Sequence, residues 1–250
     1  MVSGTTAIPQ NAVLRSLCPD DFWTLRPYLR RVSFNQHAII QEHSKLITHV
    51  DFIEAGLVSL RAIADGSVIE TAIVGRQGIS GASIVLGGRH AAHQSRALIA
   101  GSALRIEVHD LLRSMEKRPT IRNGMLSYVE ALMIHGAQLA LCGVRHSIEE
   151  RVAFWMCLAS DAINCSTLPI THERISINLG VRRAGITEAL SRFQTEGVIR
   201  KMRGALEIAE RGRLEASACC CYRVVAASYR SRPRAEPSRS HVENDMALGR

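Results

Sequence analysis

The spacing of apolar residues changes twice along the chain, and each change predicts a different structure. Between Val32 and about Ile106, short β-rich runs alternate with glycine turns, which is typical of antiparallel strands. The runs cover residues 50–53, 57–60, 68–74 and 97–106. Asp65-Gly66 lies between two of them and predicts a tight hairpin, because both turn positions require positive φ. We expect an antiparallel roll or barrel of roughly eight strands, preceded by one or two short helices over residues 14–30.

From Pro119 to about His146 the spacing becomes helical. Two lines of residues follow a 3-4 spacing: Leu126, Val129, Met133, Gly136, Ala140 and Gly143; and Met125, Tyr128, Leu132, His135, Leu139 and Cys142. One line would face the roll and the other a partner chain, as in a coiled-coil dimer. A helix buried within one large domain gives the same short pattern, and we favour the dimer over it. A second helix is predicted over 148–163, with Ser147 and Glu150 forming a capping box.

Residues 169–208 predict a helix-turn-helix followed by a hairpin. Thr171 is a suitable N-cap for a first helix, and Gly180 supplies a tight turn. A second helix runs from about Arg182 to Glu196, with Gly197 as its C-cap. Its buried stripe is Ile186, Leu190 and Phe193. Residues 198–202 and 205–208, joined by Arg203-Gly204, predict a β-hairpin wing, which separates this pattern from a generic helical hairpin with a solvated basic face.

Charge and composition agree with a nucleic-acid partner. The formal net charge is +8, and residues 165–213 carry a net charge of +4, against +3 over the much longer segment 1–118. No uninterrupted apolar run approaches the roughly 20 residues of a membrane helix, and the first eleven residues show no signal-peptide pattern. The seven cysteines are odd in number and irregularly spaced, which does not fit a disulfide framework. We therefore expect a cytoplasmic chain with reduced thiols and no membrane partner.

Four stretches resemble the Crp/Fnr family of transcription regulators. Residues 168–208, LPITHERISINLGVRRAGITEALSRFQTEGVIRKMRGALEI, look like the C-terminal domain of that family. RHSIEERVAFWMCLASD resembles its passage from the dimerisation helix to the DNA-binding domain, and DFIEAGLVSL and VGRQGISGASIVLGG resemble its cyclic-nucleotide-binding-like roll. The resemblance spans roughly residues 14–215 and is most specific from 145 to 210. It implies a sensor roll, a homodimer and binding to two-fold symmetric operators, with RNA polymerase as a further partner.

The expected class is thus α+β, with an N-terminal antiparallel, jelly-roll-like β-roll, a long dimerisation helix and a C-terminal winged helix. The expected boundaries are 14–118 for the sensor roll, 119–146 for the dimerisation helix, 147–215 for the winged helix-turn-helix and 228–250 for a disordered tail.

The recognition helix suggests which residues read DNA. Family members with known half-sites use a Glu followed four residues later by an Arg, and the matching positions here are Ala184 and Glu188. The usual half-site sequence is therefore not transferred to this chain. Arg183 matches an arginine used by some members and suits guanine. The candidates for base contacts are Arg183, Thr187 and Glu188; those for phosphate contacts are Thr171, Arg182, Arg192, Arg200, Lys201 and Arg203.

The roll departs from the cyclic-AMP-binding members. Those place a Glu where Ala82 falls and an Arg-Ser pair where Gln94-Ser95 fall, so the groups that hold ribose and cyclic phosphate are missing at these positions. The candidate effector-binding residues are Gly81, Ala82, Gln94, Ser95 and Arg96. Cys18 is alone in the region where iron–sulfur relatives carry a cysteine cluster, and the histidines give no haem-ligand pattern. We expect neither cyclic AMP nor an iron–sulfur cluster nor haem.

Cys219-Cys220-Cys221 is the remaining chemical signal. Three adjacent residues cannot all point the same way, and no fourth ligand lies nearby in the sequence, so we expect no metal site there. No phosphate loop, nucleophile elbow or carboxylate pair indicates an enzyme. The alternative function is a ligand-sensing or signalling module whose C-terminal domain binds a protein instead of DNA.

Overall fold

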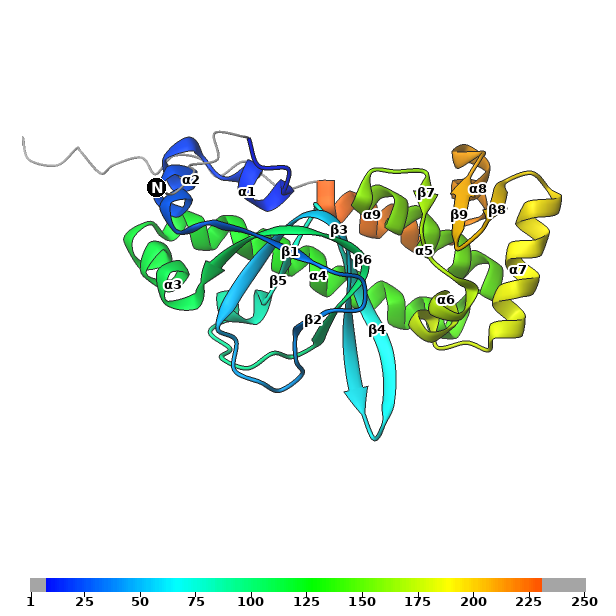
Figure 1. The fold of residues 1–250 in the computed structure, drawn as a ribbon, viewed down its shortest axis with the longest axis horizontal. Coiled ribbons are helices and arrows are strands. Elements are labelled where there is room, and N and C mark those ends of the chain that lie inside the picture. The colour runs from blue at the N-terminus through cyan, green and yellow to red at the C-terminus, as the bar shows by residue number, and fades with distance from the viewer. Residues whose placement is uncertain (1–7, 231–250) are drawn as a thin grey trace, which may run out of the picture.

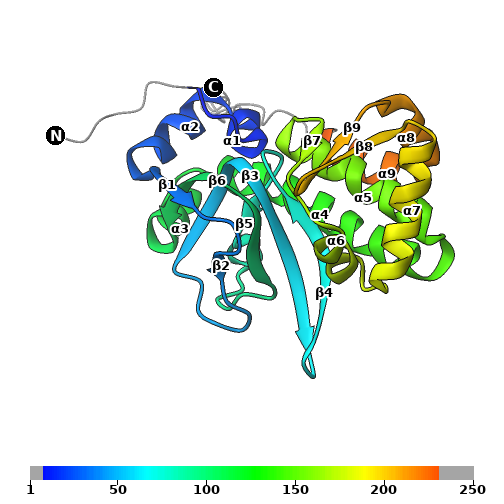
Figure 2. The same ribbon diagram turned by 45° about the vertical axis from the view of Figure 1, so that its right-hand side comes forward.

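The computed structural model describes residues 8–230. An antiparallel roll with short helices around it forms one end of the molecule, and a helix-rich domain forms the other (Figures 1 and 2). The long helix α4 (Pro119–Arg145) runs along the roll toward that domain. The α+β class with an N-terminal antiparallel β-roll is confirmed.

The roll contains fewer and longer strands than the sequence suggested. Its sheet has the order β1-β6-β3-β4, with β2 paired to β6 and β5 paired to β3. The strands are β1 (Arg30–Phe34), β2 (Ile39–Gln41), β3 (His49–Ala64), β4 (Ser67–Val74), β5 (Ile79–Ser80) and β6 (Gln94–Glu107). All pairings are antiparallel, and β3 and β6 pair along most of their length.

The prediction of roughly eight short strands is wrong for the described residues, because the runs 50–53 and 57–60 belong to one strand, β3. The strand is kinked at Gly56, which has a φ of +86°, and the register with β6 shifts there. A Cβ at Gly56 would lie 2.7 Å from the carbonyl oxygens of Ile99 and Ala100, so only glycine permits this bulge. The hairpin at Asp65-Gly66 is confirmed, with φ of +48° and +74° at the two turn positions.

Short helices close the roll at both ends of its sequence. The predicted N-terminal helices are α1 (Ala12–Ser16) and α2 (Pro19–Leu25), followed by the 3₁₀ turn η1 (Arg26–Tyr28). A second 3₁₀ turn, η2 (Ala82–Leu86), follows β5, and α3 (Val108–Lys117), which the sequence analysis did not separate, follows β6. Their apolar side chains pack with the sheet and the first half of α4 into one core.

Helix α4 has two apolar faces, one buried within the chain and one exposed to solvent. Met125, Tyr128, His135 and Cys142, all on the second predicted line, are buried within the chain. On the opposite side, a row of exposed apolar residues spaced by seven, four, three and four positions forms what we call the outer seam. Its members are Leu126, Met133, Ala137, Ala140 and Val144. The first predicted line is therefore split, since Val129 is buried while Leu126, Met133 and Ala140 are exposed.

By length and composition alone, α4 is also apolar enough to cross a membrane, and it is the single such helix among residues 8–230. One such helix is weak evidence, because core helices pass the same test. Ile121, Met125, Tyr128 and Val129 are buried in the core of the roll, which identifies α4 as a core helix with one uncovered side.

The C-terminal elements are α5 (Ile148–Ile163), β7 (Thr167–Leu168), α6 (His172–Leu179), α7 (Arg183–Thr195), β8 (Ile199–Met202), β9 (Ala205–Ile208), α8 (Arg211–Ser217) and α9 (Cys221–Arg230). They include the predicted helices α5, α6 and α7 and the wing strands β8 and β9 in the expected order, together with β7, α8 and α9, which were not predicted. The capping box of Ser147 and Glu150 is present at the start of α5. Helix α9 extends to Arg230, so the expectation of a disordered tail from residue 228 is wrong for residues 228–230; the rest of that tail lies outside the described residues.

A buried polar contact joins the roll to the C-terminal domain. The Trp155 Nε1–H on α5 donates to Glu70 Oε1 on β4 over 2.6 Å, and Ser59 on β3 donates to the other carboxylate oxygen. Arg61 on β3 donates from Nη2 to Asn178 Oδ1 on α6 over 3.2 Å. All five residues are buried. Since an unpaired buried polar group costs about 1–3 kcal/mol, these bonds fix how the two parts meet.

The Glu70 carboxyl gives this contact a pH dependence. Burial raises the pKa of Glu70 to about 7, although hydrogen bonds from Ser59 and Trp155 lower it. The folded state therefore holds the proton more tightly than the unfolded state. The stabilisation is present at acidic pH and is lost as the pH rises through about 7.

We predict that Glu70→Gln removes this dependence, since an amide can still accept from Trp155 and does not ionise. Between pH 5 and pH 8 the unfolding free energy of the native protein should fall relative to the variant by on the order of 3 kcal/mol. Urea unfolding at several pH values measures this difference. Burial lowers the pKa of His135 to about 3, which has the opposite sign, but that contribution is common to both proteins and cancels. Parallel curves for the two proteins would contradict the prediction.

Candidate DNA-binding interface and effector cavity

Helices α6 and α7 form the predicted helix-turn-helix. Thr171 caps α6, and its Oγ1 accepts from the Arg174 N–H over 3.3 Å. Gly180 ends α6 with a φ of +63°, which permits the tight turn into α7. Ile175 and Leu179 of α6 face the core of this domain. The turn is therefore fixed by one side-chain cap, one left-handed glycine and two buried aliphatic residues.

Helix α7 lies at the end of the molecule away from the roll (Figures 1 and 2). Its predicted stripe of Ile186, Leu190 and Phe193 is buried. This leaves Arg183, Thr187 and Glu188, the base-contact candidates, on the exposed side. The Arg183 side chain is 69% exposed and lies 3.6 Å from the Glu173 carboxylate of α6, a weak and exchangeable surface pair. All three candidates therefore face solvent together.

Gly185 in the first turn of α7 has a packing role that the sequence did not reveal. A Cβ there would lie 2.8 Å from Cδ1 of Ile148, the first residue of α5. The small residue thus allows α7 to approach the start of α5 closely, which offsets the roughly 1 kcal/mol that glycine costs within a helix.

Strands β8 and β9 form the predicted wing beside α7. They pair from Ile199↔Ile208 to Met202↔Ala205 and turn at Arg203-Gly204, where Gly204 has a φ of +73°. β9 also pairs with β7, which attaches the wing to the segment before α6. Lys201 donates from Nζ to Ser191 Oγ of α7 over 2.9 Å. The wing therefore holds its cations beside the exposed face of α7.

The six phosphate-contact candidates differ in whether a carboxylate already pairs with their side chain. Arg182, the residue before α7, and Arg203, at the wing turn, are exposed, and Arg200 pairs with Glu207 of the same hairpin over 3.5 Å. Arg192 lies at the far end of α7 and pairs with both Glu149 and Glu196. These two carboxylates compensate its charge, so among the six it is the candidate least available for a phosphate.

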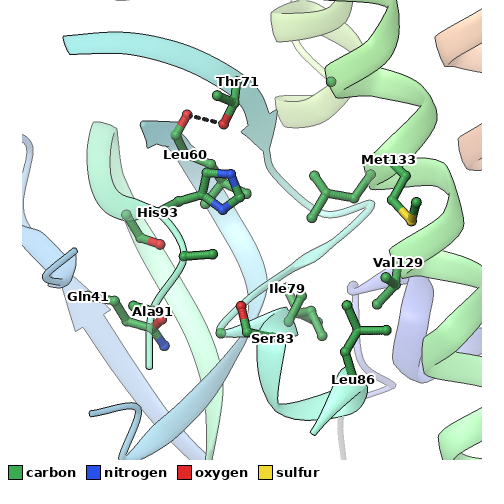
Figure 3. A pocket seen from close by; sticks show the side chains of 16 residues that line it. Gln41, Leu60, Thr71, Ile79, Ser83, Leu86, Ala91, His93, Val129 and Met133 are labelled. Atoms are coloured by element: carbon green, nitrogen blue, oxygen red, sulfur yellow. Dashed lines mark hydrogen bonds between the residues drawn. The ribbon is translucent and has the colours of Figure 1, made fainter. Parts of the chain in front are cut away.

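A cavity of about 360 Å³ lies between the roll and α4 (Figure 3). Val129 and Met133 reach it from α4, while Gln41, Ala91 and His93 line the side formed by the roll. Burial lowers the pKa of His93, and the charge of His43 adds to the shift, so this imidazole is neutral at physiological pH. The wall is largely apolar. The cavity thus lies between the roll and α4, the helix that carries the outer seam.

The structure brings three of the five effector candidates to this cavity. Gly81, Ala82 and Ser95 line it. Gln94 instead donates to Glu42 Oε1 over 2.8 Å at the surface. Arg96 lies close enough to Arg174 of α6 that its charge, after burial, lowers the pKa of that arginine. Successive residues of a strand point to opposite faces, which explains why Ser95 reaches the cavity and its two neighbours do not.

The lining was tested against a cyclic nucleotide. Among the described residues, the cavity wall contains no Lys, Arg, Asp or Glu. A cyclic phosphate would meet no opposite charge there, and burying an unpaired charge is costly. The fit of this cavity to cyclic AMP is therefore poor. The wall suits an uncharged, largely apolar small molecule.

Sequence analysis missed the neighbours of the cysteine run. Cys219 and Cys221 point inward and lie beside Cys142 and His146 at the end of α4, whereas Cys220 is exposed. The premise that no fourth ligand lies nearby was wrong. Cys142 and His146 are four residues apart, which places them on one helix face, and this Cys-x₃-His spacing was a signal in the sequence.

Comparisons with known proteins support the DNA-binding assignment. Residues 150–217 match the family model described as the Crp-like helix-turn-helix domain. A putative Crp/Fnr regulator from Eubacterium rectale is 20% identical, with a TM-score of 0.63 over 83% of this chain and 97% of that one. FixK2 from Bradyrhizobium japonicum is 16% identical, with a TM-score of 0.64 over 77% of this chain and 98% of that one. Comparison with curated protein sequences gives no match.

A β-roll joined to a winged helix-turn-helix with an exposed second helix defines a DNA-binding transcription regulator. Residues 150–217 form a Crp-like helix-turn-helix domain, and the chain as a whole has the fold of Crp/Fnr transcription regulators. At these identities the solved structures establish the fold alone, and the matched domain establishes the kind of DNA-binding module.

Proposed function

We propose that the protein works as a homodimer that reads a two-fold symmetric DNA site through two copies of α7. The observation that supports this proposal most directly is the exposed side of α7, where Arg183, Thr187 and Glu188 face solvent beside a basic wing. A recognition helix enters the major groove with its N-terminal residues at the base edges, which matches the position of Arg183 and Thr187. Half-sites would lie about 34 Å apart, one turn of the duplex.

Base contacts divide among three side chains in this proposal. Arg183 donates to guanine O6 and N7 after leaving Glu173, and Glu188 accepts from a cytosine amino group. Thr187, whose Oγ1 lies 3.3 Å from His172 Nδ1, contacts a thymine methyl or a base edge. The residues proposed to hold phosphates are Thr171, Arg182, Arg200, Lys201 and Arg203, with Arg192 joining them only if it leaves its two carboxylates.

The outer seam of α4 supports the homodimer. Its residues repeat at coiled-coil spacing and are exposed, Met133 by 69% and Val144 by 83%. Contiguous exposed apolar surface on a soluble regulator marks an interaction site. Dimers of this family use two-fold symmetric operators, so the seam and the operator symmetry support each other.

A ligand in the cavity is the proposed signal. The cavity wall includes Val129, Met133 and Gly136 of α4, so occupancy would favour one position of that helix. A shift of α4 in each protomer would change the spacing of the two recognition helices. The ligand is proposed to be uncharged, because the described wall offers no charged partner.

The remaining assignments follow from this role. The site of action is the cytoplasm, where DNA is accessible; RNA polymerase is a further partner of an activator of this kind, and no catalytic activity is proposed. The rival function is a module whose C-terminal domain binds a protein. Salt dependence separates the two, because phosphate contacts release counterions and the logarithm of the binding constant falls by about 0.9 per contact for each unit of log salt. A weak or flat salt dependence would favour the protein-binding module.

We predict that Arg183→Ala relaxes specificity at one base pair in each half-site. Losing a bidentate guanine contact should weaken binding by about 5- to 150-fold, or 1–3 kcal/mol. Titrating the native operator and its single-base variants measures both effects. Arg113→Ala, which removes the same charge from the exposed side of α3 in the roll, is the matched control and should leave binding unchanged. Equal effects of the two variants would exclude a base contact by Arg183.

We predict that Val144→Glu dissociates the dimer. Closing the seam would bury a carboxylate from each protomer, and 1.4 kcal/mol is enough for a tenfold loss of affinity, so we expect a weakening of roughly tenfold or more. Sedimentation over a range of concentrations measures the dissociation constant. Ser127→Glu on the flank of α4 adds the same charge outside the seam and should have little effect. A dimer of undiminished affinity in the Val144 variant would place the interface elsewhere.

A further inference from the structure

Four soft ligand groups converge where α4 ends and α9 begins. Cys142 lies in the last turn of α4, His146 is its C-cap, Cys219 precedes α9, and Cys221 is the first residue of α9. One potential ligand atom from each lies within 4.8 Å of all the others. We call these four residues the Cys₃His cluster. The three cysteines are buried and His146 is partly buried, so the cluster is largely shielded from solvent.

The spacing of these atoms fits a tetrahedral metal ion. A Zn–S bond of about 2.3 Å at the tetrahedral angle places two sulfur atoms about 3.8 Å apart. The Sγ atoms of Cys142 and Cys219 lie 3.2 Å apart, and Cys221 Sγ lies 3.7 Å from His146 Nδ1. Both distances lie within about 1 Å of the ligand separations in a tetrahedral zinc site, and the remaining ligand atoms lie within 4.8 Å of one another.

The backbone explains why these groups meet. Cys142 and His146 are four residues apart, so they project from one side of the last helical turn. Cys219 and Cys221 lie on either side of Cys220 at the start of α9. There the Tyr222 N–H donates to the Cys219 carbonyl oxygen and closes a turn of the backbone. Cys220 is directed to solvent. Two pairs of ligands from distant parts of the sequence thus face each other.

We propose that the Cys₃His cluster binds one zinc ion, or a similar thiophilic divalent ion, with all four protein ligands. Thiolate and imidazole donors favour zinc over magnesium or calcium, which prefer oxygen. A set of four protein ligands is that of a closed structural site, because a catalytic zinc keeps a position open for water. Binding displaces the three thiol protons to solvent, so uptake weakens at acidic pH.

The ion would fasten α9 to the turn between α4 and α5. His146 is the C-cap of α4 and is followed directly by Ser147, the N-cap of α5. Along α9, the Tyr229 hydroxyl contacts His135 Nδ1 over 3.0 Å, so α9 already lies against α4. On the proposed function, this turn sets how the recognition helix is held relative to α4. Metal occupancy would therefore stabilise one orientation of the DNA-binding domain.

The test is metal binding by the full chain, purified with a thiol reductant. Zinc content is measured on the purified protein, and Co²⁺ is titrated into protein stripped with a chelator. We expect one ion per chain and the absorption bands of tetrahedral cobalt–thiolate. Cys219→Ser should lower Co²⁺ affinity by at least about 100-fold, since it removes a ligand and not merely a supporting contact. Cys220→Ser, the adjacent exposed thiol, is the matched control and should retain full binding.

A measurement on the native protein covers the case in which Cys219→Ser does not fold. With zinc present, alkylation followed by mass spectrometry should label the exposed Cys165 and Cys220 and spare Cys142, Cys219 and Cys221; after chelation the labelling of these three should rise. Buried thiols that remain unlabelled with or without zinc would contradict the proposal. So would a native protein that binds no Co²⁺, equal losses in both serine variants, or a Cys142–Cys219 disulfide that forms in place of metal binding.

Operator binding is measured separately on the same samples. Protein that binds its operator but no metal would overturn this inference and leave the proposed function standing. Protein that binds one zinc ion but no DNA would do the reverse.

Discussion

The arrangement of the molecule depends on one buried carboxyl. Glu70 on β4 accepts from Trp155 on α5 and from Ser59 on β3, so a single side chain from the roll holds the first helix of the DNA-binding half. A carboxyl in this position is costly when ionised, since burial raises its pKa to about 7. The contact therefore stabilises the fold while Glu70 is protonated and weakens when Glu70 ionises. It places α5, and through its core α6 and α7, at a defined position beside the β3–β4 hairpin.

Helix α4 transmits this arrangement to the rest of the protein. Its buried side closes the core of the roll. Met133 of the outer seam also lines the cavity, and the seam as a whole stays exposed. On the proposed function, this helix links a ligand in the cavity to the pairing of two chains. The Cys₃His cluster lies at the end of the same helix, at the turn into α5. On the proposed function, sensing, pairing and orientation of the DNA-binding domain share this one element.

Much of the fold could be predicted from local signals. The capping box at Ser147, the cap at Thr171 and the positive φ at Gly180 act over a few residues, so their sequence patterns are sufficient. Strand length could not be predicted, because Gly56 is typical of a turn in the sequence. The close approach of β6 in the structure shows that it forms a bulge within one strand. The Cys₃His cluster joins two pairs of ligands that are at least 73 positions apart. Each pair has a local spacing, but the sequence does not show that the two pairs meet. The pairing of Arg192 with Glu149 was missed for the same reason.

The central claim is that two exposed recognition helices, fixed by symmetry, read one DNA site. The most direct measurement is selection of bound fragments from genomic DNA by the purified full chain, followed by alignment of the recovered sequences. The account predicts a two-fold symmetric motif whose half-sites are centred about one helical turn apart. Recovery of unrelated fragments, or of an asymmetric single half-site, would contradict it.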